Sequence, residues 1–369
     1  MQTCERFFVQ INFRMDKTVL LGMTPPELKE VALSCGLPPY AGGQMARWLY
    51  GKGVRSIAGM TDISKEGRAR LEERFTVGMT LPSESFTSSD GTRKYLFPVT
   101  CPLGQGKDAP SESSMVEAVV IPDGDRRTLC VSSQAGCKMG CKFCMTGRQG
   151  FHGHLSAADI LSQFLAIDEA RDITNAVFMG MGEPFDNYSS VMRSIEVLTS
   201  DWGFGWSPKR ITVSTIGVLP KLADFIRDSR CHLAVSLHDP FPEERARIMP
   251  VQNTYPLEQV LSLIRAHDFG LQRRVSFEYT MFKGFNDDIR HADALARALR
   301  GIQCRVNLIR FHRIPDFPYE TSPDIDIERF RSRLALAGII CTVRASRGED
   351  ISAACGLLAG RHDERNSNV

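Results

Sequence analysis

The sequence predicts an α/β protein whose main part is an open, partial barrel of six strand–helix units, a (β/α)6 arrangement. From Thr128 onward, short apolar runs rich in β-branched residues alternate with amphipathic helical stretches. Alternation of this kind is typical of a parallel sheet with right-handed crossovers. Six units before a last strand fall short of the eight that close a barrel. We therefore expect the barrel to stay open.

The apolar runs are the expected strands of this barrel, and the amphipathic stretches between them are its expected helices. The strands cover residues 129–132, 176–179, 211–214, 233–237, 275–281, 305–309 and 339–343. The clearest helices cover residues 157–170, 191–198, 257–266 and 289–300. In βα barrels the chemistry lies where strands end and loops begin. Polar residues that follow these strands are therefore candidates for a site.

An all-helical accessory domain is expected over residues 17–76, after an N-terminal extension of residues 1–16. Its first helix should begin at Thr24-Pro-Pro-Glu27, which matches a capping box with prolines in the first turn. Further helices are expected near residues 44–49 and over 64–75. Several Lys and Arg residues give this domain a basic surface.

A small β-extension is expected over residues 77–121, between the helical domain and the barrel. Asp90-Gly91 is typical of a hairpin turn. Residues 101–114 are rich in Gly, Pro and Ser and indicate a flexible loop, and 115–121 should form a strand. The rest of the chain divides into the core, residues 122–353, and a C-terminal segment, residues 354–369.

The composition indicates a cytoplasmic protein. No apolar stretch of the 369 residues is long enough to cross a bilayer. The first fourteen residues lack the basic start and apolar core of a signal peptide, and Met15 is a second candidate for the start of translation. Eleven cysteines without a secretion signal indicate a reducing compartment. We expect no membrane association.

The charge is nearly balanced overall, at +2, but its distribution is uneven. Residues 126–158 contain five Lys or Arg residues and no acid, and residues 265–313 contain ten basic and five acidic residues. Basic charge around a site suits a polyanionic substrate or the carboxylate of a cofactor. For the second stretch, ordinary solvated helix faces explain the surplus equally well.

Three closely spaced cysteines dominate the candidate chemistry. Cys137, Cys141 and Cys144 form a Cys-x3-Cys-x2-Cys run directly after the first expected strand. Three thiolates at this spacing can ligate three irons of a [4Fe–4S] cluster and leave the fourth iron open for S-adenosylmethionine. Structural zinc usually needs a second cysteine pair, and a ferredoxin needs a fourth cysteine nearby. The spacing favours the open cluster over zinc or plain electron transfer.

Other polar residues follow the later strands. Gly182 and Glu183 lie in the GMGEP segment after the second strand, where the glycines let the backbone approach a ligand. Ser214 ends the third strand, Ser236–His238 ends the fourth, and Asn307 lies within the sixth. Taken one by one, such residues more often satisfy local backbone groups than bind ligands.

Several motifs taken together resemble the RlmN/Cfr family within the radical S-adenosylmethionine superfamily. The likeness runs from about Lys17 to Arg361. The motifs are LCVSSQAG at 129–136, GMGEP at 180–184, SLH at 236–238, VNLIR at 306–310 and DISAACGLLAG at 350–360, together with the cysteine run.

The resemblance implies a radical S-adenosylmethionine barrel, an RNA-contacting N-terminal domain, a [4Fe–4S] cluster and S-adenosylmethionine as cofactors. It implies cluster ligation by Cys137, Cys141 and Cys144. It also implies cofactor contacts from Gly182, Glu183, Ser214, Ser236, Leu237, His238 and Asn307.

The resemblance further implies catalytic roles for Cys355, Cys130 and Glu117. Carbon-2 of adenine is electron-poor and cannot attack a methyl sulfonium, so the methyl group is first placed on the Cys355 thiolate. RNA then becomes joined to the protein through a methylene thioether, which disulfide formation with Cys130 resolves. Glu117 is the implied base, although the sequence alone suggests an exposed strand carboxylate. Cys355 lies in a segment that the sequence suggests is helix-like.

The expected reaction is methylation of adenosine carbon-2 in 23S rRNA, at the peptidyl-transferase centre, and in the anticodon loop of some tRNAs. Pro184 and Arg347-Gly-Glu-Asp350 resemble RlmN, whereas Arg310 and Met145-Thr-Gly147 resemble Cfr, so carbon-8 methylation stays an alternative. A radical enzyme that does not methylate and a cluster protein without enzymatic activity are two further classes. An electron donor such as flavodoxin is an expected partner of a monomeric enzyme.

Overall fold

A computed structural model describes residues 17–102, 111–270 and 275–359 of the chain. The chain divides between Gly78 and Met79 into two compact units. Residues 1–16, where we expected an extension, lie outside the described residues.

The first unit consists of short helices around a small apolar core. Its helices are α1 (Pro25–Ser34), α2 (Ala41–Ala46), which continues into a π-helix (Arg47–Gly51), a 3-10 turn (Ile57–Gly59) and α3 (Lys65–Arg74). The capping box is present, since the Thr24 backbone N–H donates to Glu27 Oε2 at 2.6 Å. One short parallel pair, β1 (Thr18–Val19) with β2 (Phe75–Thr76), joins the two ends of the unit.

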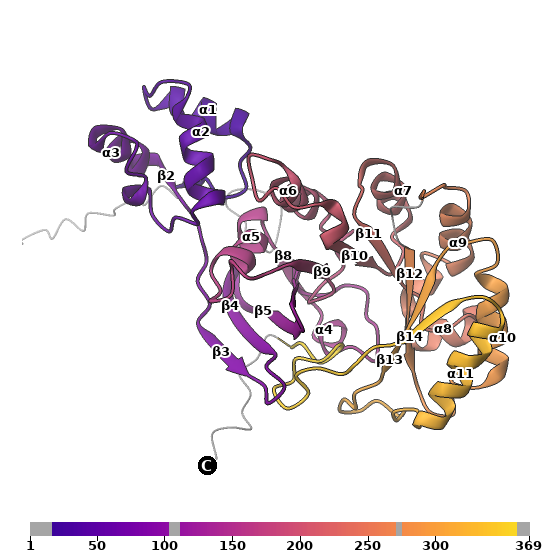
Figure 1. Ribbon diagram of the computed structural model, residues 1–369. Coiled ribbons are helices and arrows are strands. Elements are labelled where there is room, and N and C mark those ends of the chain that lie inside the picture. The colour runs from indigo at the N-terminus through magenta and orange to yellow at the C-terminus, as the bar shows by residue number, and fades with distance from the viewer. Residues whose placement is uncertain (1–16, 103–110, 271–274, 360–369) are drawn as a thin grey trace, which may run out of the picture. The chain divides into compact units, whose positions relative to one another are not determined.

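The second unit is built on one ten-stranded sheet in the order β14-β13-β12-β11-β10-β9-β6-β5-β4-β3 (Figure 1). The strands from β6 to β14 in this order are parallel, and all seven correspond to predicted strands. The sheet has two free edges, at β14 and β3, so the open barrel is confirmed. The parallel strands are β6 (Arg126–Cys130), β9 (Asn175–Phe178), β10 (Ile211–Thr215), β11 (His232–Ser236), β12 (Val275–Met281), β13 (Arg305–Arg310) and β14 (Ile340–Val343).

Helices connect successive parallel strands, as the alternating pattern predicts. Buried parallel strands are apolar along their length, and Val213, Leu233 and Phe277 are fully buried between the sheet and these helices. Within the described ranges, no helix is both long and apolar enough to cross a membrane. The helices are α5 (Ala157–Leu165), α6 (Tyr188–Thr199), α7 (Leu219–Asp228), α8 (Pro242–Ile248), α9 (Leu257–Arg265), α10 (Ile289–Ala298) and α11 (Asp324–Leu336), with 3-10 turns at Pro208–Arg210 and Pro250–Asn253.

Three antiparallel strands extend the sheet beyond β6. They are β3 (Glu84–Thr87), β4 (Arg93–Pro102) and β5 (Ser111–Asp123). The predicted hairpin turn at Asp90-Gly91 is present, and Gly91 has a φ of +83°. The prediction of a loop over 101–114 was wrong at both ends, because β4 and β5 stay paired as far as Pro102 and Ser111. Proline is tolerated there because a strand end needs no donor.

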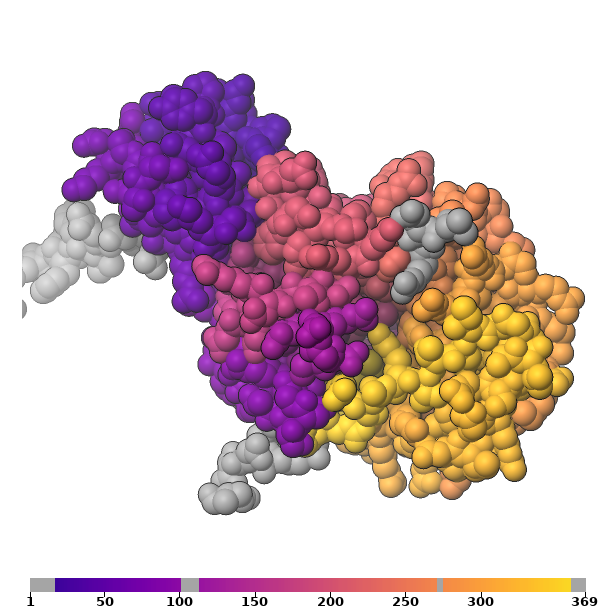
Figure 2. Space-filling model, in the orientation of Figure 1, coloured from indigo at the N-terminus to yellow at the C-terminus, as the bar shows by residue number. Residues whose placement is uncertain are grey.

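The chain after β14 also differs from the prediction. Residues 344–359 form turns rather than a helix, because Gly348, Ser352 and Gly356 have φ angles between +53° and +86°. Asp350 accepts hydrogen bonds from Ser88 Oγ at 2.6 Å and from the Ser89 N–H at 3.0 Å. Figure 2 shows this yellow segment lying against the purple β-extension.

Candidate active site

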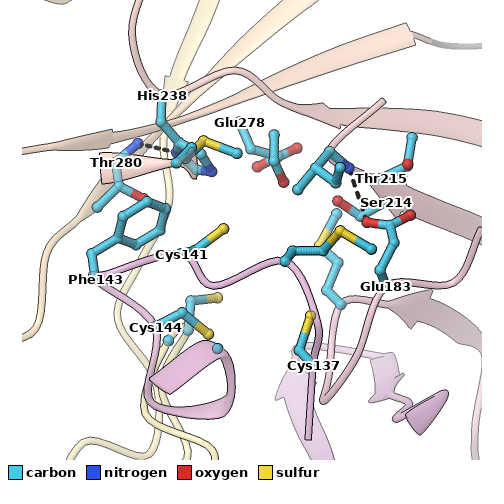
Figure 3. A pocket seen from close by; sticks show the side chains of 18 of the residues that line it. Cys137, Cys141, Phe143, Cys144, Glu183, Ser214, Thr215, His238, Glu278 and Thr280 are labelled. Carbon is cyan, nitrogen blue, oxygen red and sulfur yellow. Dashed lines mark hydrogen bonds between the residues drawn. The ribbon is translucent and has the colours of Figure 1, made fainter. Parts of the chain in front are cut away.

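A cavity of about 160 Å³ opens at the carboxyl ends of the parallel strands. Its lining comes from the ends of β9 to β13, from the loop after β7 (Gln134–Gly136) and from the C-terminal segment (Figure 3). This is the edge of the sheet where βα folds place their chemistry. We call this space the cluster cavity.

The loop that carries the three cysteines is fixed at both ends. Strand β7 pairs with β8 (Phe151–His154), and the Cys137 N–H donates to Gly150 O at 2.7 Å. A Cβ on Gly136, whose φ is +70°, would lie 2.0 Å from Gly150 O, so only glycine fits here. Cys144 precedes the short helix α4 (Met145–Arg148). The loop therefore closes into a tight ring.

The structure brings Cys137, Cys141 and Cys144 together on one wall of the cluster cavity (Figure 3). Burial raises the pKa of Cys137 to about 12 and raises the pKa of Cys141 and Cys144 as well. The nearby charges of Cys144 and Cys137 raise the pKa of Cys141 further, because like charges disfavour its thiolate form. Three thiolates can share this space only around cations, which fits the irons of a [4Fe–4S] cluster.

Aromatic and imidazole rings form the wall beside the cluster loop. The Phe143 ring packs edge-on against the His238 ring, with 4.9 Å between the ring centres, and its centre lies 5.5 Å from that of the Phe282 ring. His238 Nδ1 accepts a hydrogen bond from the Thr280 N–H at 3.0 Å, so its proton is on Nε2 (Figure 3). Burial lowers the pKa of His238 to about 3, with a further contribution from Arg245, so the ring is neutral.

Glu183 presents a buried carboxylate to the cluster cavity. It accepts hydrogen bonds from the Phe185 N–H at 3.1 Å and the Ile216 N–H at 3.0 Å. Burial nevertheless raises its pKa to about 7. A buried carboxylate of this kind gains from a cationic partner, and the ammonium of S-adenosylmethionine is one. Gly182 beside it has a φ of +96° and packs against Gln134, with no room for a side chain.

The other predicted cofactor contacts divide into two groups. Ser214, Ser236 and His238 line the cluster cavity. Leu237 is fully buried and Asn307 is not among the lining residues; Asn307 Nδ2 instead donates to Glu278 Oε1 at 2.8 Å. The Asn307 side chain therefore lies behind Glu278, which itself lines the cavity.

Cys130 and Cys355 meet at a second cavity that adjoins the first. Cys355 is exposed and lines both cavities, whereas Cys130 at the end of β6 is buried and lines only the second. Burial, and then the nearby Cys355 thiol, raise the pKa of Cys130 to about 12, and Arg344 partly opposes this. We call this second space the thiol cavity.

The segment around Cys355 is attached to the cluster loop. The Met145 N–H donates to Gly356 O at 2.8 Å, and Thr146 Oγ1 donates to Leu358 O at 2.7 Å. Both donors belong to α4, directly after Cys144. These bonds replace the helix that the sequence suggested and place Cys355 in the wall of the cavity that Cys137, Cys141 and Cys144 also line.

Glu117 is buried in the β-extension rather than exposed. It lies on β5, and Glu117 Oε1 is 3.8 Å from Lys94 Nζ on β4. It lines neither cavity. Cys130 pairs with Val119, two residues along β5, so Glu117 and Cys130 share one face of the sheet.

Three charged residues of the site were missed by the sequence reasoning. Arg344, directly after β14, lines both cavities, and its Nη1 lies 3.6 Å from Glu278 Oε2. Glu278 on β12 is buried in the wall of the cluster cavity. Arg245 on α8 is fully buried and donates a hydrogen bond to the carbonyl of Ser236, which lines the same cavity. The sequence offered two signals for these residues: the alternation of side chains along β12 for Glu278, and the position directly after β14 for Arg344.

Comparison with known proteins defines the class of this fold and site. A model of the radical SAM superfamily matches residues 131–296. A model described as the ribosomal RNA large subunit methyltransferase N-terminal domain matches residues 18–77. A crystal structure of a radical SAM methyltransferase from Sphaerobacter thermophilus is similar, with a TM-score of 0.85, 37% identity, and coverage of 93% of this chain and all of that one.

Curated relatives make the assignment more specific. A probable dual-specificity RNA methyltransferase RlmN from Porphyromonas gingivalis is 56% identical over 343 residues, which cover 93% of this chain and 94% of that protein. The dual-specificity RNA methyltransferase RlmN of Dichelobacter nodosus is 39% identical, with coverage of 95% and 96%. The chain belongs to the RlmN family of radical SAM RNA methyltransferases.

Replacing Cys141 with alanine should abolish the cluster while leaving the fold intact. The three thiols converge from one loop, so two of them cannot hold the same cluster. Iron, sulfide and visible absorption after anaerobic reconstitution measure the effect. Cys341→Ala, on β14 and outside both cavities, is the matched control and should keep the full brown colour. A colourless wild type would contradict the site assignment.

Cys355 should react with iodoacetamide roughly tenfold or more faster than Cys130 at pH 8, because Cys355 is exposed, whereas Cys130 is buried and burial raises its pKa. The Cys141→Ala variant avoids a competing cluster. Peptide-resolved mass spectrometry gives both rates, and denaturation in urea should make them similar. Equal rates in the folded protein would show that Cys130 is not shielded.

Proposed function

We propose that this protein methylates carbon-2 of adenosine in 23S rRNA, at the peptidyl-transferase centre, and in the anticodon loop of some tRNAs. One observation carries the proposal beyond the family: Cys355 and Cys130 line one cavity, and Cys355 also lines the cavity of the cluster cysteines. A thiol that carries a methyl group needs access to both spaces.

The cofactor-binding roles follow from the cluster cavity. Cys137, Cys141 and Cys144 would hold a [4Fe–4S] cluster, and Glu183, Ser214, Ser236 and His238 would hold S-adenosylmethionine. Leu237 and Asn307 would support this binding from behind the lining. When bound, these two groups supply the methyl group and the radical chemistry.

Cys355 and Cys130 act in sequence in this proposal. Cys355 Sγ carries the methyl group as a thioether. This methyl group would lose one hydrogen atom to the radical that bound S-adenosylmethionine would supply, and its carbon would then bond to carbon-2 of the adenine, which gives up its ring proton. The Cys130 thiolate then attacks Cys355 Sγ. The new disulfide forms as the bond between sulfur and carbon breaks; the carbon leaves with the electron pair of that bond and takes up a proton, which completes the methyl group of the released RNA.

Glu117 is the proposed base that removes the ring proton. Support comes from its position on the same face of the sheet as Cys130. Its carboxylate lies outside the lining of the thiol cavity in the described structure, next to Lys94. The proposal therefore requires that the side chain turn toward the cavity when RNA is bound.

The thiol cavity suits a nucleotide. Four arginine side chains and one histidine line it, and Asp123 is the single acidic residue of this lining. Positive charge around a concave site attracts phosphate groups. An adenine that has left its stack can then reach both thiols. The basic residues are Arg126, Arg310, Arg347 and His312, in addition to Arg344 beside the thiols.

The partners proposed are 23S rRNA, tRNA and an electron donor such as flavodoxin, with the enzyme acting as a monomer in the cytoplasm. The electron donor follows from the proposed cluster, which must be reduced before each radical step. The RNA partners follow from the proposed reaction.

Mass spectrometry of digested RNA should detect 2-methyladenosine after incubation with the reconstituted enzyme. Synthetic standards separate it from the 8-methyl isomer. Carbon-8 methylation is the alternative to weigh, because Arg310 is Cfr-like and lines the thiol cavity. Finding only the 8-methyl isomer would overturn the position proposed here. Cys355→Ala should produce neither isomer, and retained activity would instead indicate a different reaction class.

Cys130→Ala should trap RNA on the protein instead of merely losing activity. Without the resolving thiol, the thioether between Cys355 and the RNA persists after the carbon–carbon bond has formed. The purified variant should carry a nuclease-trimmable adduct, measured as added mass on the Cys355 peptide. The Cys130→Ala, Cys355→Ala double variant is the control and should carry none. An inactive Cys130→Ala variant free of RNA would rule out the resolving role.

A further inference from the structure

We propose that Asp239, Glu244 and His291 form a mononuclear divalent-cation site, suited to Zn²⁺, which is separate from the cluster ligands. The three side chains come from the turn after β11, from α8 and from the first turn of α10. None of them lines the cluster cavity or the thiol cavity. One histidine and two carboxylates are ligand types that zinc accepts, with water in a fourth position.

The distances between the ligand atoms suit one small cation. His291 Nε2 lies 2.9 Å from Glu244 Oε2 and 3.8 Å from Asp239 Oδ2, and all three atoms lie within 4.8 Å of one another. Tetrahedral ligands at zinc bond lengths are separated by roughly 3.4 Å. The two distances from His291 Nε2 differ from this value by about half an ångström, and the distance between the Asp239 and Glu244 oxygens, at most 4.8 Å, would shorten to it when the ion binds.

A buried oxygen without a partner is the second observation that points to a ligand. Asp239 is fully buried, and its Oδ2 has no hydrogen-bond partner among the described residues. The other oxygen, Oδ1, accepts from the Phe241 N–H at 2.8 Å, which fixes the carboxylate with Oδ2 toward His291. Leaving such an oxygen unsatisfied is costly, and a bound cation would supply its partner.

The far side of the histidine is arranged as in a metal site. His291 Nδ1 lies 2.7 Å from Asp288 Oδ1, and the same oxygen accepts from the His291 N–H at 2.9 Å. Asp288 is the N-cap of α10. Histidines that bind metals usually donate their second N–H to a carboxylate, which fixes the tautomer. Nε2 is then left to face Asp239 and Glu244.

The charges around the site favour a cation. Three carboxylates, those of Asp239, Glu244 and Asp288, surround His291, and Arg290 is the guanidinium paired with Glu244 at 2.8 Å. The Arg290 guanidinium also stacks on Phe241, and its Nη2 lies 3.4 Å from His291 Nε2. Arg290 balances one of the three negative charges, and a divalent ion would balance the remaining two.

The consequence is local support for the active site. Asp239 directly follows His238, which lines the cluster cavity and has a φ of +59°, unusual for a residue with a side chain. A cation bound to Asp239 would join this turn to α8 and α10. The cation site would therefore stabilise the turn that carries His238, and this role does not depend on the proposed methylation.

Cobalt binding tests the proposal in the full chain. The cluster cysteines also bind metals, so the background is the Cys137→Ala, Cys141→Ala, Cys144→Ala variant. One equivalent of Co²⁺ should bind with d–d absorption of a tetrahedral site and without sulfur-to-cobalt charge transfer, and Zn²⁺ should displace it. No binding of Co²⁺ would overturn the proposal. A charge-transfer band would also overturn it, because the remaining thiols would then be the ligands.

Substitutions identify the ligands. In that background, Asp239→Asn should abolish Co²⁺ binding and the rise in melting temperature caused by Zn²⁺. Asp288→Asn keeps a good helix cap and should weaken binding by about 10- to 100-fold. Asp293→Asn, on the same helix but paired with Arg333, is the control and should bind normally. If Asp239→Asn does not fold, Glu244→Gln, which is partly exposed, gives the same comparison. Binding unchanged by these ligand substitutions would refute the site.

Discussion

The buried guanidinium of Arg245 holds the floor of the cluster cavity together. Its Nε donates to Leu237 O at 2.9 Å, and its Nη2 donates to Ser236 O at 3.1 Å and to Ile216 O at 3.4 Å. These carbonyls belong to the last residue of β11 and to the residues that directly follow β10 and β11, and they need donors in the protein interior. Burial lowers the pKa of Arg245 to about 10, which still leaves it charged at neutral pH.

Much of the site depends on this one side chain. The Ile216 N–H donates to Glu183, and Ser236 and His238 line the cavity on either side of Leu237. Removing a buried charge that satisfies several carbonyls leaves all of them without partners. The same guanidinium interacts favourably with the Cys141 thiolate, and Arg344 does so with Cys130 and Cys355. Each cavity thus has a fixed positive charge beside its sulfur atoms, in place before any ligand binds.

The sequence was sufficient to predict the parallel sheet and the cysteine loop, because both depend on residues close together in the chain. Apolar runs identify buried strands, and three cysteines within eight positions indicate a loop that can bind a metal cluster. Side chains whose surroundings depend on strand register could not be predicted. Asn307 pairs with Glu278 across β12 and β13 and donates to it, whereas the sequence suggested a side chain that reaches the cofactor. Glu117 is buried because β4 places Lys94 beside it.

The antiparallel extension explains how an irregular segment can hold an exposed cysteine beside both cavities. The turn between β3 and β4 binds residues 348–350, and α4 binds residues 356–358, so the segment is held on both sides of Cys355. Between these attachments Cys355 is exposed and contributes to no strand or helix. The thiol can therefore change direction between the two cavities without breaking the ladder of the sheet. A helix at this position would have fixed the side chain toward one of the two spaces, and the left-handed backbone at Ser352 and Gly356 prevents that helix from forming.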